Sequence, residues 1–169
     1  MTGSKVLIVL GSDSDFAVME PCFRLLRNFG IQYDACVCSA HRSPRKAAEI
    51  ASQAREEGYN VIIAAAGLAA HLPGVLAAYT ILPVIGVPIC TGALSGNDAL
   101  YSIVQMPAGV PVASVAIDGA ANAAILAAQI LALSDGKVGE MLLSYKNELE
   151  LSVELRNERL ADKLLTIGE

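Results

Sequence analysis

The chain of 169 residues is long enough for one substantial hydrophobic core, and its length calls for no second domain. Its residues are 54% hydrophobic but only 5% aromatic, which predicts a core of Ala, Val, Leu and Ile where strands are covered by helices on both sides. The net charge of -5 and the lack of Lys- or Arg-rich runs argue against a nucleic-acid or membrane surface. Any phosphate-bearing ligand must therefore be held by a local site.

The charged residues are concentrated towards the two ends of the chain. From Asn60 to Ser134 only Asp98 and Asp118 are charged. A soluble monomer of this size could hardly bury such a block completely, so we expect a homo-oligomer in which much of it meets other copies of the chain. The alternative, a membrane span over 61–79, is weaker because no polybasic flank follows and Gly67, His71, Pro73 and Gly74 interrupt the run.

The N-terminus and the cysteines both suggest a reducing compartment. Met1 leads almost directly into a predicted strand, which leaves no room for a signal peptide, so we expect a cytoplasmic protein. The cysteines are interpreted as reduced thiols packed as small apolar side chains: Cys22, Cys36, Cys38 and Cys90. Cys36 and Cys38 with His41 match no common zinc spacing, so no metal site is expected.

Apolar runs alternate with helix-like segments along most of the chain. The predicted strands are 5–10, 33–38, 61–66, 84–89 and 112–117, and the predicted helices are 16–28, 44–58, 73–79, 98–105 and 120–133. This alternation predicts an α/β domain over 1–134, built on a parallel sheet with helices on both faces. The helix over 120–133 is apolar nearly all round, so we expect it in the core or in a subunit interface.

The last segment has a different composition from the rest. Beyond Asp135-Gly136 the chain becomes ionic, and Leu142, Tyr145, Leu149 and Val153 recur at helical spacing. We therefore expect residues 135–169 to form a helical extension that packs on the same or a neighbouring subunit.

The turn after the first strand, Gly11 to Asp15, combines a sharp bend with polar side chains. Ser14 or Asp15 can cap the helix that follows, which would be a purely structural role. The same turn also suits a ligand, because the hydroxyls of Ser12 and Ser14 with free backbone N–H groups fit a phosphate, and the Asp15 carboxylate fits a sugar diol.

The turn after the second strand, Ser39-Ala40-His41-Arg42-Ser43-Pro44, carries the strongest functional signal. Pro44 suits the first position of a helix, so an imidazole, a permanent cation and two hydroxyls lie where N–H groups and the helix dipole favour an anion. His41 can take and give a proton at neutral pH, although it could also sit in a surface turn with no role. Arg42 could form an ordinary surface ion pair or hold a phosphate.

Two further turns follow the third and fourth strands. The loop Gly67 to Gly74 is rich in small residues that let a ligand approach the backbone, and His71 within it either satisfies buried backbone groups or lines a pocket. The fourth turn is Cys90 to Gly96. Ligands of parallel sheets bind outside the carboxyl ends of the strands, so all four turns should share one rim.

Familiar cofactor and catalytic motifs cannot be picked out. The sequence shows no Gly-x-Gly-x-x-Gly, Walker loop, paired metal carboxylates or Ser-His-Asp triad. The expected chemistry therefore uses a proton carrier, a phosphate clamp and a pocket of small residues, with no organic cofactor.

Five segments together resemble one enzyme family. They are Gly-Ser-Asp-Ser-Asp at 11–15, Ser-Ala-His-Arg-Ser-Pro at 39–44, Ala-Ala-His-Leu-Pro-Gly at 69–74, Ala-Leu-Ser-Gly at 93–96 and Ser-Ile-Val-Gln-Met-Pro at 102–107. In this order and spacing they resemble the bacterial, class I N(5)-carboxyaminoimidazole ribonucleotide mutases of purine biosynthesis. The resemblance extends over about 5–133.

The resemblance implies a three-layer α/β/α sandwich of flavodoxin type and a homo-octamer whose active sites use more than one chain. It also implies transfer of a carboxylate from the exocyclic nitrogen of an aminoimidazole ribonucleotide to ring carbon 4, without ATP, metal or cofactor. By motif, His41 would be the general acid and base, and the substrate-binding residues would be Ser12, Ser14 and Arg42 for the phosphate, Asp15 for the ribose, and Ser39, Gly67, Leu68, His71 and Leu72.

The sequence departs from the family pattern at two places. The family usually has Gly-Gly where this chain has Gly67-Leu68, and the stretch Ile117-Asp118-Gly119 is shorter than usual. His71-Leu72-Pro73-Gly74 favours the mutases over related carboxylases that accept carbon dioxide directly. Direct carboxylation and a non-catalytic module that binds a phosphoribosyl ligand are the alternatives.

Overall fold

A five-stranded parallel sheet forms the centre of the computed structural model, which describes residues 4–168. The strands are β1 (Lys5–Leu10), β2 (Gln32–Val37), β3 (Val61–Gly67), β4 (Val84–Ile89) and β5 (Ala113–Ser114), in the order β2-β1-β3-β4-β5. The three inner strands are almost wholly buried, as their continuous apolar runs predict, whereas β2 lies at one edge and is largely exposed.

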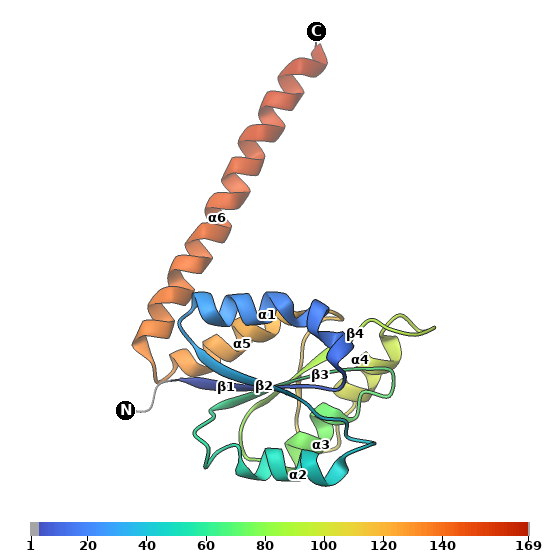
Figure 1. Cartoon of the computed structure of the whole chain (residues 1–169). Helices are drawn as coiled ribbons and strands as arrows, with labels where there is room; N and C mark the ends of the chain where they lie inside the picture. The colour runs from blue at the N-terminus through green and yellow to red at the C-terminus, as the bar shows by residue number, and fades with distance from the viewer. Residues whose placement is uncertain (1–3, 169) are drawn as a thin grey trace.

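Helices cover both faces of the sheet (Figure 1). The helices on one face are α1 (Phe16–Asn28), α5 (Ala120–Ala132) and the start of α6 (Gly136–Leu165), and those on the other are α2 (Pro44–Gln53), α3 (Leu72–Tyr79) and α4 (Asn97–Val104). Short 3-10 turns, η1 (Asp13–Asp15) and η2 (Thr166–Gly168), complete the elements. The predicted three-layer α/β/α arrangement with a C-terminal helix is confirmed.

Strand alternation divides the core into two layers. Val6 and Ile8 of β1 pack with α1 and α5, while Leu7 and Val9 face α2, α3 and α4. Helix α5 contributes buried alanines from Ala120 to Ala128 and lies directly against α1. The burial expected for this apolar helix is therefore supplied by the core of its own chain.

Helix α6 begins on the body and then leaves it. Val138, Leu142 and Tyr145 pack into the layer formed with α1 and α5, and the Tyr145 ring meets Phe29 edge to face with centroids 5.5 Å apart. Beyond this point the helix projects away from the domain (Figure 1). Leu149 and Val153 are 46% and 53% exposed, so the apolar stripe continues past the surface that covers its first part.

Two predicted elements were too long. Helix α2 ends at Gln53 and not near Gly58, and residues 54–58 continue as turns that close at the left-handed Gly58 (φ +87°), with the Tyr59 amide on the Ala54 carbonyl at 3.0 Å. Strand β5 pairs only at 113–114 and not over 112–117. The chain leaves the sheet towards Asp118, whose amide bonds the Pro88 carbonyl and whose side chain accepts from the Cys90 amide, both at 2.8 Å.

Residues 61–79 form β3 and α3, so the alternative of a membrane span there is wrong. Across 4–168, no helix has the length and hydrophobicity to cross a bilayer.

The cysteines are free thiols, but only Cys22 and Cys38 are fully buried and Cys90 is exposed, contrary to the expected packing. Burial raises the pKa of the Cys22 thiol to about 12. No cluster of three or more potential metal ligands occurs among the described residues.

Candidate active site

A single cavity of about 390 Å³ lies at the carboxyl ends of the strands, a volume in the range of small-molecule sites. Every site residue proposed from the sequence lines it: Ser12, Ser14, Asp15, Ser39, His41, Arg42, Gly67, Leu68, His71 and Leu72. The lining is completed by Gly11, Ala40, Ala66, Ala69 and Thr91. Segments up to 80 residues apart in sequence therefore meet at one place.

The turn after β1 is held by its own side chains. Ser12 is the N-cap of η1, its amide donates to the Asp15 carboxylate at 3.0 Å, and the Ser14 amide donates to Asp13 at 3.0 Å. Asp15, one of the two expected caps, occupies the N-cap position of α1 but makes no side-chain capping bond there; the side-chain capping belongs to η1, where Ser12 and Asp15 form a capping box. These amides are already occupied, so the groups of this turn best able to meet a ligand are the hydroxyls of Ser12 and Ser14, which lie 2.8 Å apart.

Asp15 is the one buried charged side chain found in the described chain, with 7% of its surface exposed. Burial raises the pKa of its carboxyl group, and this rise is opposed by hydrogen bonds from Ser12 and Ser14. One carboxylate oxygen accepts the Ser12 amide and thereby fixes the turn. The carboxylate nevertheless borders the cavity, so capping and ligand contact are compatible roles.

The turn between β2 and α2 is fixed by its serines and leaves its cation free. The Ser43 hydroxyl donates to the Ser39 carbonyl at 2.9 Å and accepts from the Ser39 amide, so it serves the turn and does not reach the cavity. The Arg42 amide donates to the Ser39 hydroxyl at 3.2 Å. Neither of the two ion pairs found within 4–168 uses Arg42, so its guanidinium can bind an anion.

The two histidines of the chain are in direct contact. His41 Nε2 lies 2.7 Å from His71 Nδ1, with ring centroids 4.9 Å apart and planes at 75°. One nitrogen must donate and the other accept, so at least one of the two rings is neutral in this arrangement. His41 keeps Nδ1 as a second position for a proton. This contact supports His71 as a pocket residue over the alternative of satisfying backbone groups in a buried loop.

The loop after β3 brings backbone and apolar groups to the cavity. Gly67 is half-buried, Leu68 is 53% exposed, and Leu72 is 2% exposed and belongs to the core layer beneath the loop. Leu68 adopts a left-handed backbone (φ +54°), which branched residues rarely do. The loop can therefore offer a ligand little polar side-chain contact besides His71.

Sequence reasoning missed Thr91. The turn 90–96 was placed on the correct rim, but no residue in it was singled out. The available signal was position alone, because Thr91 follows the carboxyl end of β4 just as Ser12 and Ser39 follow β1 and β2.

A larger hollow of about 640 Å³ lies between α1 and the edge strand β2, but its polar groups already have partners. Arg24 pairs with Glu20 at 2.6 Å and Arg27 bonds the Tyr33 hydroxyl at 3.3 Å. The smaller cavity, which is lined by Arg42 and both histidines, is the better candidate for chemistry.

Comparison with known proteins gives the same family as the motifs. The model of a family described as AIR carboxylase matches residues 5–152. Relatives named N(5)-carboxyaminoimidazole ribonucleotide mutase include those of Pyrococcus horikoshii (52% identity over 155 residues, 92% of this chain and 88% of the relative), Thermotoga maritima (50% over 156 residues, 92% and 91%) and Escherichia coli (51% over 145 residues, 85% and 86%).

Comparison of structures agrees. The crystal structure of Treponema denticola PurE superposes with a TM-score of 0.82 at 28% identity, covering 93% of this chain and 98% of that one. The family model matches most of the chain, the relatives are about 50% identical to it, and the fold is shared. This chain therefore belongs to the AIR carboxylase family.

Proposed function

We propose that this protein is a mutase that converts N(5)-carboxyaminoimidazole ribonucleotide to 4-carboxy-5-aminoimidazole ribonucleotide in purine biosynthesis. The observation that carries the proposal is the convergence of a free guanidinium, serine hydroxyls and a histidine pair on one cavity. The relatives named for this activity, at about 50% identity over most of the chain, support the same substrate.

The proposed binding mode follows the charges around the cavity. Arg42, Ser12 and Ser14 hold the phosphate, because a cation and rotatable hydroxyls complement a dianion. Asp15 accepts hydrogen bonds from the ribose hydroxyls. Ser39 and the loop 67–72 then surround the base and its carboxylate, where small side chains allow close approach to the backbone.

The proposed chemistry needs no cofactor because the substrate requires no external electron sink. An electron-rich aminoimidazole behaves as an enamine, so its ring can accept or release a carboxyl group. The bond between the exocyclic nitrogen and the carboxyl carbon breaks to release carbon dioxide, and carbon 4 then attacks that molecule within the cavity. Confinement makes recombination effectively unimolecular.

His41 balances the protons of this exchange. It supplies a proton to the exocyclic nitrogen as the first bond breaks and removes the proton from carbon 4 after the second bond forms. A positioned acid and base of this kind contributes roughly 10²–10⁴ in rate. His71, bonded to His41 Nε2, holds the imidazole in place between the two transfers.

The experiment that tests the function is a choice of substrates. Purified protein receives either the N-carboxylated nucleotide alone or aminoimidazole ribonucleotide with bicarbonate. Rapid turnover in the first mixture supports the mutase. Turnover in the second mixture alone would reject it in favour of direct carboxylation, and binding without any conversion would favour the non-catalytic module.

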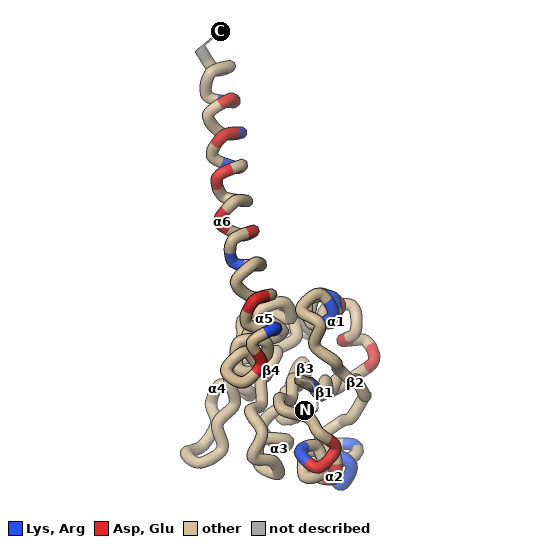
Figure 2. Tube along the Cα trace, turned by 90° about the vertical axis from the view of Figure 1, so that its left-hand side faces the viewer, with Lys and Arg blue, Asp and Glu red and all other residues tan. Residues whose placement is uncertain are grey.

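We further propose that the working enzyme is a homo-octamer with shared active sites. Figure 2 shows α3 free of charged residues, whereas charges mark α1, α2 and α6, and α4 carries the single charged residue Asp98. Large apolar side chains are exposed on and beside α3 and α4: Tyr79, Ile81, Leu94, Tyr101 and Val104. Burial against other copies would explain them.

In the same assembly, the outer part of α6 packs on a neighbouring subunit and covers the stripe that continues through Leu149 and Val153. Light scattering tests the assembly, because a single 17.6 kDa species at micromolar concentration would contradict it. The phosphorylated substrate is consistent with a cytoplasmic enzyme.

A further inference from the structure

Thr91 lines the cavity from the carboxyl end of β4, and its side chain is packed against Gly67. A Cβ added at Gly67 would collide with the Thr91 methyl group, so the methyl group occupies space that only glycine leaves open. A side chain that branches at Cβ has few rotamers, and packing one branch fixes the direction of the other. The hydroxyl is therefore the part of the Thr91 side chain that is left for a ligand.

The backbone beside Thr91 is anchored on the side away from the cavity. The Cys90 amide donates to the Asp118 carboxylate, and the Asp118 amide donates to the Pro88 carbonyl, both at 2.8 Å. These two bonds join the end of β4 to the segment that follows β5. The position of the Thr91 hydroxyl is thus set by the folded chain before a ligand arrives.

The Thr91 hydroxyl keeps its hydrogen-bonding capacity. Within its turn, the Ser95 amide donates to the Gly92 carbonyl at 3.4 Å. The Asn97 side-chain amide donates to the Leu94 carbonyl at 3.0 Å. Among residues 4–168, none of the hydrogen bonds of this turn uses the Thr91 side chain. A hydroxyl with a fixed direction and no partner in the chain can donate to a ligand.

The order of the strands indicates which part of the nucleotide Thr91 meets. The turns proposed to hold the phosphate follow β2 and β1, whereas the loop 67–72 and Thr91 follow β3 and β4, the next two strands across the sheet. Neighbouring strands lie about 4.8 Å apart, so β4 is about 10 Å from β1. A ribonucleotide bound by its phosphate at the first two turns therefore presents its base to the last two.

We infer that Thr91 is a specificity-determining residue whose hydroxyl donates a hydrogen bond to the carboxylate of the nucleotide. This inference rests on the proposed mutase function. The exocyclic nitrogen is attached to the ring carbon next to carbon 4, so one fixed donor can reach the carboxylate before and after its transfer. A hydrogen bond to a charged acceptor is stronger than one to a neutral group, so Thr91 favours the carboxylated nucleotides over aminoimidazole ribonucleotide.

The test compares two ligands that differ only in the carboxylate. Equilibrium binding of 4-carboxy-5-aminoimidazole ribonucleotide and of aminoimidazole ribonucleotide is measured for the unchanged protein and for Thr91→Val. Valine removes the hydroxyl and keeps the methyl group that packs on Gly67. We expect Kd for the carboxylated nucleotide to rise about ten-fold or more, while Kd for aminoimidazole ribonucleotide stays within about two-fold. In turnover, KM for the N-carboxylated nucleotide should rise more than kcat changes.

Two further variants separate the hydroxyl from the shape of the side chain. Thr91→Ser keeps the hydroxyl and loses the methyl group, so it should retain most of the preference for the carboxylated nucleotide. Thr80→Val is the matched control, because Thr80 follows α3 at the opposite end of the sheet and its hydroxyl accepts the Leu82 amide. It should change the affinity for neither nucleotide.

The possible results distinguish this inference from the proposed function. If the unchanged protein forms product and Thr91→Val binds both nucleotides as before, or binds both more weakly by the same factor, the inference is wrong and the mutase stands. The inference is also wrong if Thr91→Ser loses the preference while Thr91→Val keeps it, because the methyl group would then be the important part. If the unchanged protein forms no product from the N-carboxylated nucleotide, the proposed function fails, and this inference fails with it.

Discussion

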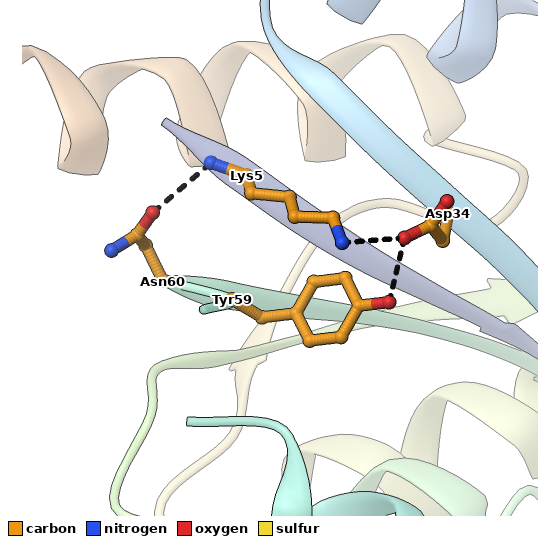
Figure 3. Close-up of polar contacts among 4 residues, drawn as sticks. All are labelled: Lys5, Asp34, Tyr59 and Asn60. Atoms are coloured by element: carbon orange, nitrogen blue, oxygen red, sulfur yellow. Dashed lines mark hydrogen bonds and ion pairs between the residues drawn. The ribbon is translucent and has the colours of Figure 1, made fainter. Parts of the chain in front are cut away.

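Polar side chains at the amino end of the sheet bond to one another, whereas those at the carboxyl end remain available to a ligand. At the amino end, Lys5 Nζ bonds the Asp34 carboxylate at 2.8 Å, the Tyr59 hydroxyl donates to the same carboxylate at 2.7 Å, and the Lys5 amide donates to Asn60 at 3.0 Å (Figure 3). The Lys5 ammonium also lies 4.3 Å from the centre of the Tyr59 ring. At the carboxyl end, Arg42 and the hydroxyls of Ser12 and Ser14 keep binding capacity for a ligand.

This difference indicates what each end contributes. The amino-end cluster joins β1, β2 and the start of β3, so its partners serve the alignment of the strands. The carboxyl-end groups bond mainly within their own turns, which fixes their positions while leaving the cation and the second histidine nitrogen available. Substitutions at one end should therefore change activity, and those at the other should change stability.

The largest expected effect is at His41. His41→Asn should lower turnover by at least about 10²-fold while nucleotide affinity stays within a few-fold, because an acid–base group is lost and the phosphate contacts remain. Single-turnover kinetics and equilibrium binding measure the two separately. Asp34→Asn serves as the control from the opposite end and should turn over normally. Unchanged turnover in His41→Asn would contradict the assigned role.

The next effect is at Arg42. Arg42→Gln should raise KM by roughly 10–100-fold with a smaller change in kcat, since a charged hydrogen bond to phosphate contributes about 1.5–3 kcal/mol. Inorganic phosphate should compete more weakly with substrate in this variant. A fall in kcat at unchanged KM would show that Arg42 acts on the reacting base and not on the phosphate.

Replacing Asp34 should lower stability and leave turnover unchanged, and the loss of stability should depend on pH. The Lys5 hydrogen bond, and then that of Tyr59, lowers the pKa of Asp34 below its ordinary 3.8. A carboxyl group whose pKa is lower in the folded state stabilises that state at pH values above its ordinary pKa. This stabilisation is lost as the pH falls through the lower pKa of the folded state. Asp34→Asn should therefore lower Tm by about 1–3 °C at pH 7, with the difference closing below about pH 4.

Thermal melts at pH 7 and pH 3 measure this difference. The effect is small because the Asp34 side chain is 56% exposed and water screens the pair. A difference that does not shrink between pH 7 and pH 3 would mean that the carboxylate charge is not responsible.

The smallest effect is expected at Tyr59. Tyr59→Phe removes one hydrogen bond to Asp34 and keeps the ring beneath the Lys5 ammonium. The free energy of unfolding should fall by an amount near the lower end of the ~0.5–1.5 kcal/mol typical of a hydrogen bond. Urea unfolding measures this change. The part of the stability that is lost in acid should remain in the variant, because Lys5 still bonds Asp34. Loss of activity in this variant would contradict the assignment of stability to the amino end of the sheet and activity to the carboxyl end.

Much of the architecture could be predicted because its signals are local. Continuous apolar runs define β1, β3 and β4, and each is followed by a turn rich in Gly, Ser or Pro. The rule that such turns share a rim was then enough to bring the candidate residues together. The length of β5 was not predictable, because it depends on the Asp118–Pro88 hydrogen bond.

The details within the site depend on how separate loops meet. No sequence pattern places His41 Nε2 on His71 Nδ1, since 30 residues separate them and the contact follows from the geometry of two turns. The approach of Thr91 to Gly67 is of the same kind. The occupied amides of the Ser12 turn were also missed, because the pattern shows which donors exist but not which acceptors they have already found.

The self-contained turn from Ser12 to Asp15 has a consequence for binding kinetics. Because its backbone is already ordered by side chains of the same four residues, an arriving anion has to reorient only two hydroxyl protons and displace water. The conformational entropy of that subsite is lost once, during folding, and is not lost again at each encounter. A preorganised subsite of this kind can capture and release its ligand without waiting for a loop to rearrange.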